Sequence, residues 1–281
     1  MDAQTNLSSS QAVIKHYLQY EPDVAYCERV TQIMEDLNFQ KNEKVLDCGC
    51  GLGTMMALVK KIDPSLSLIG LDFDSMRLKT AKDVAGAGNR FVQGSVLKLP
   101  FLDASFDKII CSELLEHLED DFLALQELFR VLKPGGVLSI SVPYKDYPFC
   151  WDPLNKIREF FGLTPWRKGV FSGAWTNHER LYARGSIEKK CYQAGFRVEK
   201  VSLSSASCFP FAHFFIYRIG RGLSGDQGKL ARKIRFGEGK ISLWNPIFLG
   251  TKIFQWFGKA SEPSNSNRRF INLVVKATKK A

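Results

Sequence analysis

Apolar residues follow two different spacings along the chain, and segments with the two spacings alternate. Short apolar runs that are rich in branched or aromatic residues and end at turn residues predict strands. Longer segments whose apolar residues recur every three or four positions predict helices. We expect helices at 11–20, 23–38, 54–61, 75–85 and 120–132, after a frayed polar start, and strands ending at Val45–Leu46 and spanning 65–72, 90–93, 106–111 and 137–142. This alternation predicts a parallel, doubly wound sheet that binds its ligand at the carboxyl ends of the strands.

A glycine-rich loop joins the first expected strand to the helix that follows. The stretch Val-Leu-Asp-Cys-Gly-Cys-Gly-Leu-Gly places Gly49, Gly51 and Gly53 at alternate positions, directly before the helix. A loop without side-chain bulk at a helix N-terminus lets the backbone approach a ligand closely. Asp47, at the end of the strand, would put a carboxylate beside that ligand. Taken alone, the stretch is also compatible with a tight turn that binds nothing.

Two further positions narrow the kind of ligand. A dinucleotide-binding loop needs the pattern G-x-G-x-x-G, but Thr54 stands where its third glycine would be, as a candidate helix cap. Asp72 ends the next strand, 19 residues past Gly53. In a nucleoside-binding α/β fold, a carboxylate at this place can accept hydrogen bonds from both ribose hydroxyls. The pair of features therefore predicts a nucleoside ligand that is not a dinucleotide.

Five motifs extend this pattern over residues 40–143. They are Val-Leu-Asp-Cys-Gly-Cys-Gly, Gly-Leu-Asp, Leu-Pro-Phe-x-Asp-x-Ser-Phe-Asp, Leu-Glu-His-Leu and Arg-Val-Leu-Lys-Pro-Gly-Gly. In this order and spacing the chain resembles class I S-adenosylmethionine-dependent methyltransferases of the type 11 branch, which includes quinone- and sterol-methylating enzymes. The resemblance implies a Rossmann-like α/β fold with seven strands, the last antiparallel. Residues 196–203, after a helix at 185–194, then fit the sixth strand, and 270–278 fit the seventh.

The resemblance also implies that one methyltransferase domain occupies residues 1–281. Its expected parts are N-terminal helices (11–39), a cofactor-binding core (40–143), an acceptor lid (144–182), a helical insertion that is basic and aromatic (205–268) and the final strand (270–278).

The implied cofactor is S-adenosyl-L-methionine. Asp72 would hold its ribose with Phe73 against the adenine, and Ser95 with Val96 would stand where many relatives have an acid for the adenine amino group. Asp47 would lie near the methionine amino group, and two residues at the end of the fourth strand would face the sulfonium. The full expected set is Asp47, Gly49, Cys50, Gly51, Gly53, Asp72, Phe73, Ser95, Val96, Cys111 and Ser112.

Methyl transfer needs a general base only where the acceptor must lose a proton. His178 precedes the helix at 185–194 in a His-x-Arg stretch that resembles one closing over the acceptor in type 11 relatives, and it is the first candidate. His117 and Tyr144 come next, followed by Glu113. The alternative for both histidines is structural, since His117 could orient its loop and His178 could anchor its own. No metal-ligand spacing links the histidines, so we expect no metal.

Composition and charge bear on the surroundings of this domain. The 281 residues are 45% hydrophobic, and their seven cysteines form no C-x-x-C pair, which indicates a reduced, cytoplasmic chain. Residues 213–281 hold 14 of the 39 Lys and Arg residues but only 3 of the 29 Asp and Glu residues. This local excess of positive charge favours an anionic partner, either a membrane surface or nucleic acid.

Two segments are expected to select the acceptor. The lid holds ten aromatic residues between 144 and 182, which favours a large apolar or flat acceptor such as a quinone, prenylated phenol or isoprenoid, although these rings could also form the lid's own core. The basic, Trp- and Phe-rich segment 209–259 is typical of an interfacial membrane helix. A packed auxiliary subdomain, an RNA methyltransferase and a non-catalytic cofactor-binding protein stay open as alternatives. The signatures of base-methylating nucleic-acid enzymes are missing from the sequence, which argues against nucleic acid.

Overall fold

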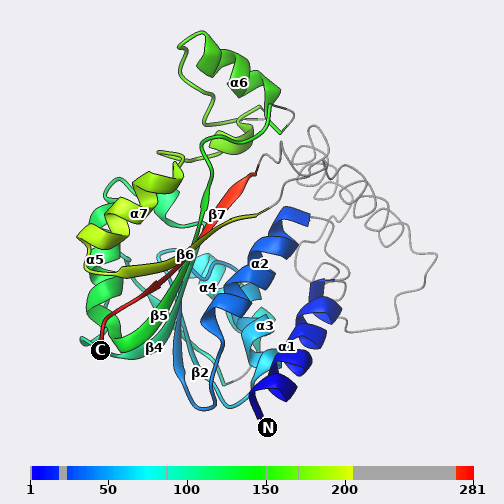
Figure 1. Cartoon of the computed structure of the whole chain (residues 1–281), viewed down its shortest axis with the longest axis vertical. Coiled ribbons are helices and arrows are strands. Elements are labelled where there is room, and N and C mark those ends of the chain that lie inside the picture. Colours follow the sequence, from blue (N-terminus) through cyan, green and yellow to red (C-terminus); the bar gives the residue numbers. More distant parts are fainter. Residues whose placement is uncertain (1, 19–23, 87, 150, 170, 205–269) are drawn as a thin grey trace, which may run out of the picture.

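A computed structural model describes residues 2–18, 24–86, 88–149, 151–169, 171–204 and 270–281, and it contains a seven-stranded sheet (Figure 1). The strands stand in the order β3-β2-β1-β4-β5-β7-β6. β7 pairs antiparallel with β5 and with β6, whereas all the other pairs are parallel. The strands are β1 (Lys44–Cys48), β2 (Ser67–Asp72), β3 (Arg90–Gln93), β4 (Phe106–Ser112), β5 (Leu132–Pro143), β6 (Arg197–Ser204) and β7 (Asn272–Thr278). The expected doubly wound α/β fold is confirmed, including the antiparallel last strand.

Helices cover both faces of the sheet (Figure 1). One face packs on α1, α2, α3 and α4, and the other packs on α5 and α7. The helices and 3-10 turns are α1 (Asp2–Leu18), α2 (Val24–Leu37), α3 (Thr54–Ile62), α4 (Ser75–Ala85), η1 (Leu115–His117), α5 (Asp121–Val131), α6 (Pro153–Phe160), η2 (Gly173–Trp175) and α7 (Arg184–Gln193). Two apolar cores result, one on each face, and they leave the carboxyl edge of the parallel strands for ligands.

Alternation along the strands divides their side chains between these two cores. In β1, Val45 lies in the core under α3 and Leu46 lies in the core on the opposite face. In β4, Ile109 and Ile110 divide in the same way. Successive side chains of a strand point to opposite faces, so strands buried on both faces are continuously apolar.

Three local expectations were wrong. The chain is helical from Asp2, and does not begin its first helix at residue 11, because polar residues can extend a helix whose later turns are buried through Ile14 and Tyr17. Thr54 is the first residue of α3 and not its cap, since the cap position is Gly53 with φ of 75° and no side-chain hydrogen bond. β5 begins at Leu132, beside Phe106, before the Lys-Pro-Gly-Gly stretch that was expected to separate helix from strand. The expected helical insertion at 205–268 lies outside the described residues.

Candidate active site

The carboxyl ends of β1, β2 and β4 meet at one edge of the sheet, and the glycine loop lies there. Cys48 at the end of β1 pairs with Leu71 on one side and Cys111 on the other. The main-chain nitrogens of Gly49 and Cys50 both donate to the carbonyl oxygen of Leu71, at 2.8 and 2.9 Å. These two bonds fix the start of the loop to the neighbouring strand.

The three glycines of the loop all have positive φ, but a side chain would meet different surroundings at each. A Cβ atom on Gly49 would lie 3.0 Å from the side chain of Leu114, and one on Gly53 would lie 3.0 to 3.1 Å from Ala81 of α4, including its backbone. A Cβ atom on Gly51 would meet nothing within 4 Å. Gly49 and Gly53 therefore permit close packing of the fold, and Gly51 leaves open space above the loop.

Asp72 supports this loop from the end of β2. Its side chain is buried, with one oxygen accepting from the Gly51 nitrogen at 2.8 Å and the other from the Asp74 nitrogen at 2.9 Å. A carboxylate has about four acceptor sites, so each oxygen can still take one more donor. This residual capacity fits a pair of hydroxyl groups on a bound nucleoside.

Asp47 is a buried acid with unfilled hydrogen-bonding capacity. It is only 5% exposed, and its Oδ2 atom has no hydrogen-bond partner among the described residues. Burial first, and then the negative charge of Asp72, raise the pKa of Asp47 to about 7. An unpaired carboxylate costs free energy in such a place unless a cation or donor reaches it. A ligand ammonium group that reached Oδ2 would supply that partner.

The other expected cofactor residues differ in exposure. Phe73 is 72% exposed, with an open ring face beside Asp72. The Ser95 hydroxyl accepts from the Leu97 nitrogen at 3.2 Å, which shapes its turn and leaves the hydroxyl proton for another acceptor. Val96 and Cys111 lie inside the core, so neither side chain presents a surface to a ligand.

Ser112 lies on the opposite face of β4 from Cys111, in a polar network. Its hydroxyl is 2.9 Å from that of Ser141, which donates to Glu113 at 3.0 Å. The Asn272 side chain donates to both oxygens of Glu113, at 3.1 and 3.2 Å, and Arg29 forms an ion pair with Glu113 at 3.4 Å. This network occupies Glu113, so Glu113 is not available as a general base in this arrangement.

The structure brings together two of the four candidate bases. The rings of His117, in η1, and His178, after η2, have centroids 4.8 Å apart. Burial first, and then the charge of His117, lower the pKa of His178, which keeps that ring neutral near pH 7. Arg180 does not reach toward this pair, because its guanidinium donates to the carbonyl oxygens of Leu118 and Glu119 and holds the two segments together.

Glu116 joins this pair and was missed by the sequence reasoning. The side chain is fully buried, and neither carboxylate oxygen has a hydrogen-bond partner among the described residues. Burial first, and then Glu113, raise the pKa of Glu116 well above its usual range. The local sequence Leu-Leu-Glu-His-Leu does not indicate that Glu116 is buried, because the residues that bury it come from segments distant in sequence.

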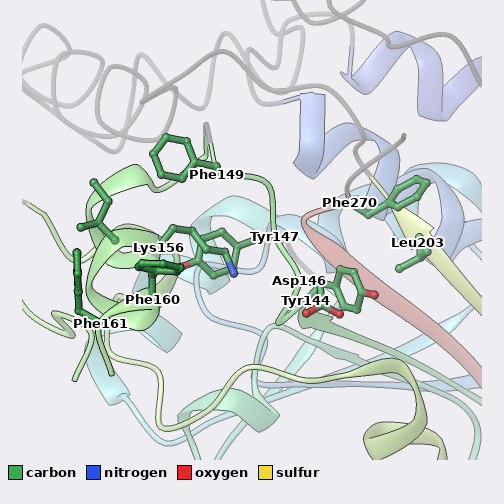
Figure 2. A pocket seen from close by; sticks show the side chains of 10 residues that line it. Tyr144, Asp146, Tyr147, Phe149, Lys156, Phe160, Phe161, Leu203 and Phe270 are labelled. Carbon is green, nitrogen blue, oxygen red and sulfur yellow. The ribbon is translucent and has the colours of Figure 1, made fainter. Parts of the chain in front are cut away.

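Another candidate base, Tyr144, lines a pocket together with residues of α6 (Figure 2). This cavity has a volume of about 770 Å³. Figure 2 shows aromatic side chains of the α6 region at one end and residues next to β6 and β7 at the other, with Tyr144 between. Its lining consists of Tyr144, Asp146, Tyr147, Phe149, Lys156, Ile157, Phe160, Phe161, Leu203 and Phe270.

The lid has a polar core of its own beneath this pocket. Asn155 is fully buried, donates to Asp152 and to the Ser172 carbonyl, and accepts from the Trp166 nitrogen. Phe160 and Phe161, in contrast, are 84% and 69% exposed. The aromatic residues of this segment therefore include some that are free to contact an acceptor, and they do not all form the core of the lid.

Residues 46–140 match the family model described as a methyltransferase domain. Over these residues the chain is similar to that family. The match includes the glycine loop, Asp72 and η1, and it confirms the resemblance to type 11 methyltransferases that the motifs indicated.

Curated relatives of the methyltransferase domain include the demethylmenaquinone methyltransferases of Staphylococcus aureus strains JH9 and Newman. Each is 34% identical over 136 residues, which cover 47% of this chain and 55% of the relative. The chain thus spans about half the length of the curated relatives it matches.

Solved structures resemble the fold over a longer stretch. A (4+2)-cyclase, SpnF, matches with a TM-score of 0.57 and 17% identity, covering 90% of this chain and 80% of the cyclase. Phosphoethanolamine N-methyltransferase 2 of Haemonchus contortus, in complex with S-adenosyl-L-methionine, matches with a TM-score of 0.54 and 16% identity, covering 90% of this chain and 52% of that one. At such identities the likeness establishes the fold, and a cyclase among the neighbours means that activity must be argued from the site.

Proposed function

We propose that this protein is an S-adenosyl-L-methionine-dependent methyltransferase that acts on a small apolar acceptor. The observation that carries the proposal is the arrangement at the carboxyl ends of β1 and β2. Asp47 has an unpaired carboxylate oxygen, Asp72 can accept further hydrogen bonds, and Gly51, which donates to Asp72, leaves open space where a side chain would stand. When bound, the cofactor supplies a methyl group on a positively charged sulfur. The described residues fit it, since the site offers an acceptor for its ammonium group, a carboxylate for its ribose and an exposed ring, Phe73, for its adenine.

The chain's own contribution to this reaction is chiefly positioning. Holding two reactants in line converts a bimolecular step into an effectively unimolecular one. The bonds from Gly49 and Cys50 to Leu71 hold the glycine loop in place, and Asp72 fixes it from the neighbouring strand. Where the acceptor must lose a proton, neutral His178 is the proposed base, with His117 beside it and Tyr144 as a second candidate in the lid pocket.

The lid pocket supports an apolar acceptor such as a quinone, a prenylated phenol or an isoprenoid. Its volume of about 770 Å³ lies in the range usual for small-molecule sites, and its lining is largely aromatic. The Staphylococcus aureus relatives are named for methylation of a quinone. The proposed product is an O- or C-methylated molecule of this class.

Membrane contact through residues 209–259 is a finer part of the proposal. It rests on the Lys, Arg, Trp and Phe content of that segment, which lies outside the described residues. Among the helices that the structure describes, none is long and apolar enough to cross a bilayer. Flotation with anionic liposomes tests the contact, and it should be lost when Lys252, Trp256, Phe257 and Lys259 are changed together. Flotation that is unaffected by these changes would contradict it.

The activity can be tested without knowing the acceptor. Protein and methyl-labelled S-adenosyl-L-methionine would be incubated with a host-cell extract, and the label then partitioned between organic and aqueous phases. An Asp72→Ala protein provides the blank. Label in the organic phase supports the apolar acceptor. Label confined to RNA in the aqueous phase would replace it with nucleic acid, and no transfer by the intact protein would favour a non-catalytic cofactor-binding role.

A further inference from the structure

Three side chains that commonly bind metal ions converge beside the candidate active site. Glu116 and His117 come from η1, and His178 comes from the loop after η2. One potential ligand atom from each lies within 4.8 Å of the other two. The Glu179 nitrogen, next to His178, donates to the Glu116 carbonyl at 2.7 Å, which holds the two segments together. Leu114, just before η1, lies against Gly49, so the cluster adjoins the glycine loop.

The hydrogen bonds of the two histidines define which ring nitrogen is free. Nδ1 of His117 lies 2.9 Å from the Asn177 carbonyl oxygen, and Nδ1 of His178 lies 2.7 Å from the Ala174 carbonyl oxygen. A carbonyl oxygen only accepts, so each Nδ1 carries the proton, and in a neutral ring Nε2 then has a free lone pair. Metal-binding histidines usually have this arrangement, because a bond from the other nitrogen orients the ring.

Glu116 supplies a carboxyl group to the same cluster. Oε1 of its fully buried carboxylate lies 3.9 Å from Nε2 of His117. Both oxygens lack hydrogen-bond partners among the described residues. Buried polar groups are normally satisfied, and an unsatisfied one calls for a missing proton, water or ion. One cation could satisfy the two imidazole lone pairs and the carboxylate together, since their potential ligand atoms lie within 4.8 Å of one another.

Among the described residues, two charged side chains outside the cluster act on Glu116, and these two, Glu113 and Arg29, form an ion pair with each other. Glu113 is the nearest further acid to act on Glu116, but its own oxygens already accept from Asn272 and Ser141. Because Glu113 is ion-paired with Arg29, it adds little net charge beside the cluster and is not itself needed as a ligand. The side chain of His117 is 39% exposed, which leaves an approach from solvent.

We propose that Glu116, His117 and His178 form a binding site for one divalent transition-metal ion of the zinc type. Two imidazoles and one carboxylate suit zinc and its neighbours better than magnesium or calcium, which prefer all-oxygen sites. Three protein ligands leave at least one coordination position for water or an acceptor oxygen. The site goes beyond the proposed methyl transfer and rests only on these three side chains and their hydrogen bonds. With an ion bound, His178 is a ligand, and Tyr144 is then the candidate base.

Metal binding can be measured directly on the full chain. The protein would be treated with a chelator, dialysed and titrated with Co²⁺, whose visible absorption reports coordination by nitrogen and oxygen, and then with Zn²⁺ in a calorimeter. One ion should bind per chain, and zinc should displace cobalt. Absence of stoichiometric binding would overturn the proposal. Nuclear magnetic resonance provides a second test on the chelator-treated protein. A protonated His117 that is ion-paired with Glu116, in a spectrum that added metal ions do not change, would also overturn the proposal.

Two substitutions separate loss of a ligand from loss of the fold. Glu116→Gln removes only the charge of a side chain that makes no hydrogen bond among the described residues, and in His178→Asn the amide nitrogen can replace Nδ1 as donor to Ala174. Each should weaken zinc binding at least about tenfold while the circular dichroism spectrum is unchanged. Glu119→Gln, at an exposed acid three residues past Glu116, is the matched control and should bind as the parent does. Equal affinity in all three variants would overturn the site.

Discussion

The main-chain nitrogen of Gly51 donates to a carboxylate oxygen of Asp72 at 2.8 Å, and this bond joins the glycine loop to the end of β2. Because the other oxygen accepts from Asp74, one carboxylate fixes both the loop and the start of the α4 segment. In the proposed function the same carboxylate also binds the ribose. Removal of this carboxylate should therefore disturb the glycine loop and weaken ligand binding at the same time.

The first prediction concerns this shared carboxylate. Asp72→Ala should weaken binding of S-adenosyl-L-methionine at least about tenfold, since hydrogen bonds to a charged group contribute about 1.5–3 kcal/mol. Isothermal titration calorimetry measures the change. Asp74→Ala is the control, because it removes the side-chain cap of α4, costs about 1 kcal/mol of stability and should leave the affinity intact. Unchanged affinity in Asp72→Ala would show that the ribose is held elsewhere.

The second prediction concerns pH. The pKa of Asp47 is raised to about 7 in the folded protein, so between pH 4 and 7 the folded state binds more protons than the unfolded state. The contribution of Asp47 to stability must then fall as pH rises through this window. Asp47→Asn should remove this slope and be more stable than the parent at pH 8, by on the order of 2–4 kcal/mol. Urea unfolding of both proteins at pH 5 and pH 8 tests this prediction. An equal change in the free energy of unfolding between the two pH values in both proteins would contradict it.

The third prediction separates two glycines of one loop. Gly53→Ala should destabilise the fold by more than the roughly 1–2 kcal/mol of a left-handed backbone, because its methyl group would meet the Ala81 backbone. Gly51→Ala should lower the free energy of unfolding only by about the same backbone strain. It should, however, weaken cofactor binding, since its methyl group enters the open space. Thermal unfolding and calorimetry on both variants would show the contrast. If Gly51→Ala bound the cofactor normally, the ligand would not occupy that space.

The fourth prediction addresses the acceptor. Phe160→Ala should raise KM for a prenylated naphthohydroquinone roughly 5- to 30-fold, as expected for the loss of about 1–2 kcal/mol of apolar contact. Affinity for the cofactor should not change, because the pocket is lined by lid and β6–β7 residues and not by the glycine loop. Leu102→Ala, an equally exposed apolar residue before β4, serves as the control. Equal KM values would place the acceptor outside the lid pocket.

The fifth prediction concerns the attachment of the lid. The Tyr182 hydroxyl donates to the buried carboxylate of Asp121, and its backbone bonds to residues on either side of Tyr144. Tyr182→Phe should lower the free energy of unfolding by about 1–3 kcal/mol, because a bond to a charged buried acceptor is lost. Tyr192→Phe on the exposed face of α7 should change it by less than about 0.5 kcal/mol. Equal losses would indicate that the Tyr182 bond contributes little.

Short-range features of the sequence predicted where the strands end and where the glycine loop lies. Asp47, the glycine loop and Asp72 lie at adjacent strand ends as expected, because a strand, a tight turn and a helix fix one another locally. The expectation for Cys111 and Ser112 neglected strand alternation, which directs neighbouring side chains to opposite faces. Cys111 is in the core as a result, and only Ser112 is outside it.

Contacts between distant segments explain what the sequence did not predict. Glu116 and His178 approach each other only because the lid returns to η1 through Glu179 and Arg180. No spacing along the chain encodes that return, so the sequence predicted no metal site. The lid pocket also depends on contacts between distant segments. Leu203 and Phe270 line it together with α6 residues, from which they are far apart in sequence.

The position of β7 between β5 and β6 has a consequence for synthesis of the chain. Among the strands that the structure describes, β6 has only β7 as its neighbour in the sheet. β6 is made before β7, so it stays without this partner while residues 205–271 are added. At about 5–20 residues per second, the ribosome needs roughly 3–13 s for that stretch. During this interval β5 and β6 both present unpaired backbone edges. Nascent chains of this protein should therefore be most prone to aggregation, and most dependent on chaperones, just before residue 272 leaves the ribosome.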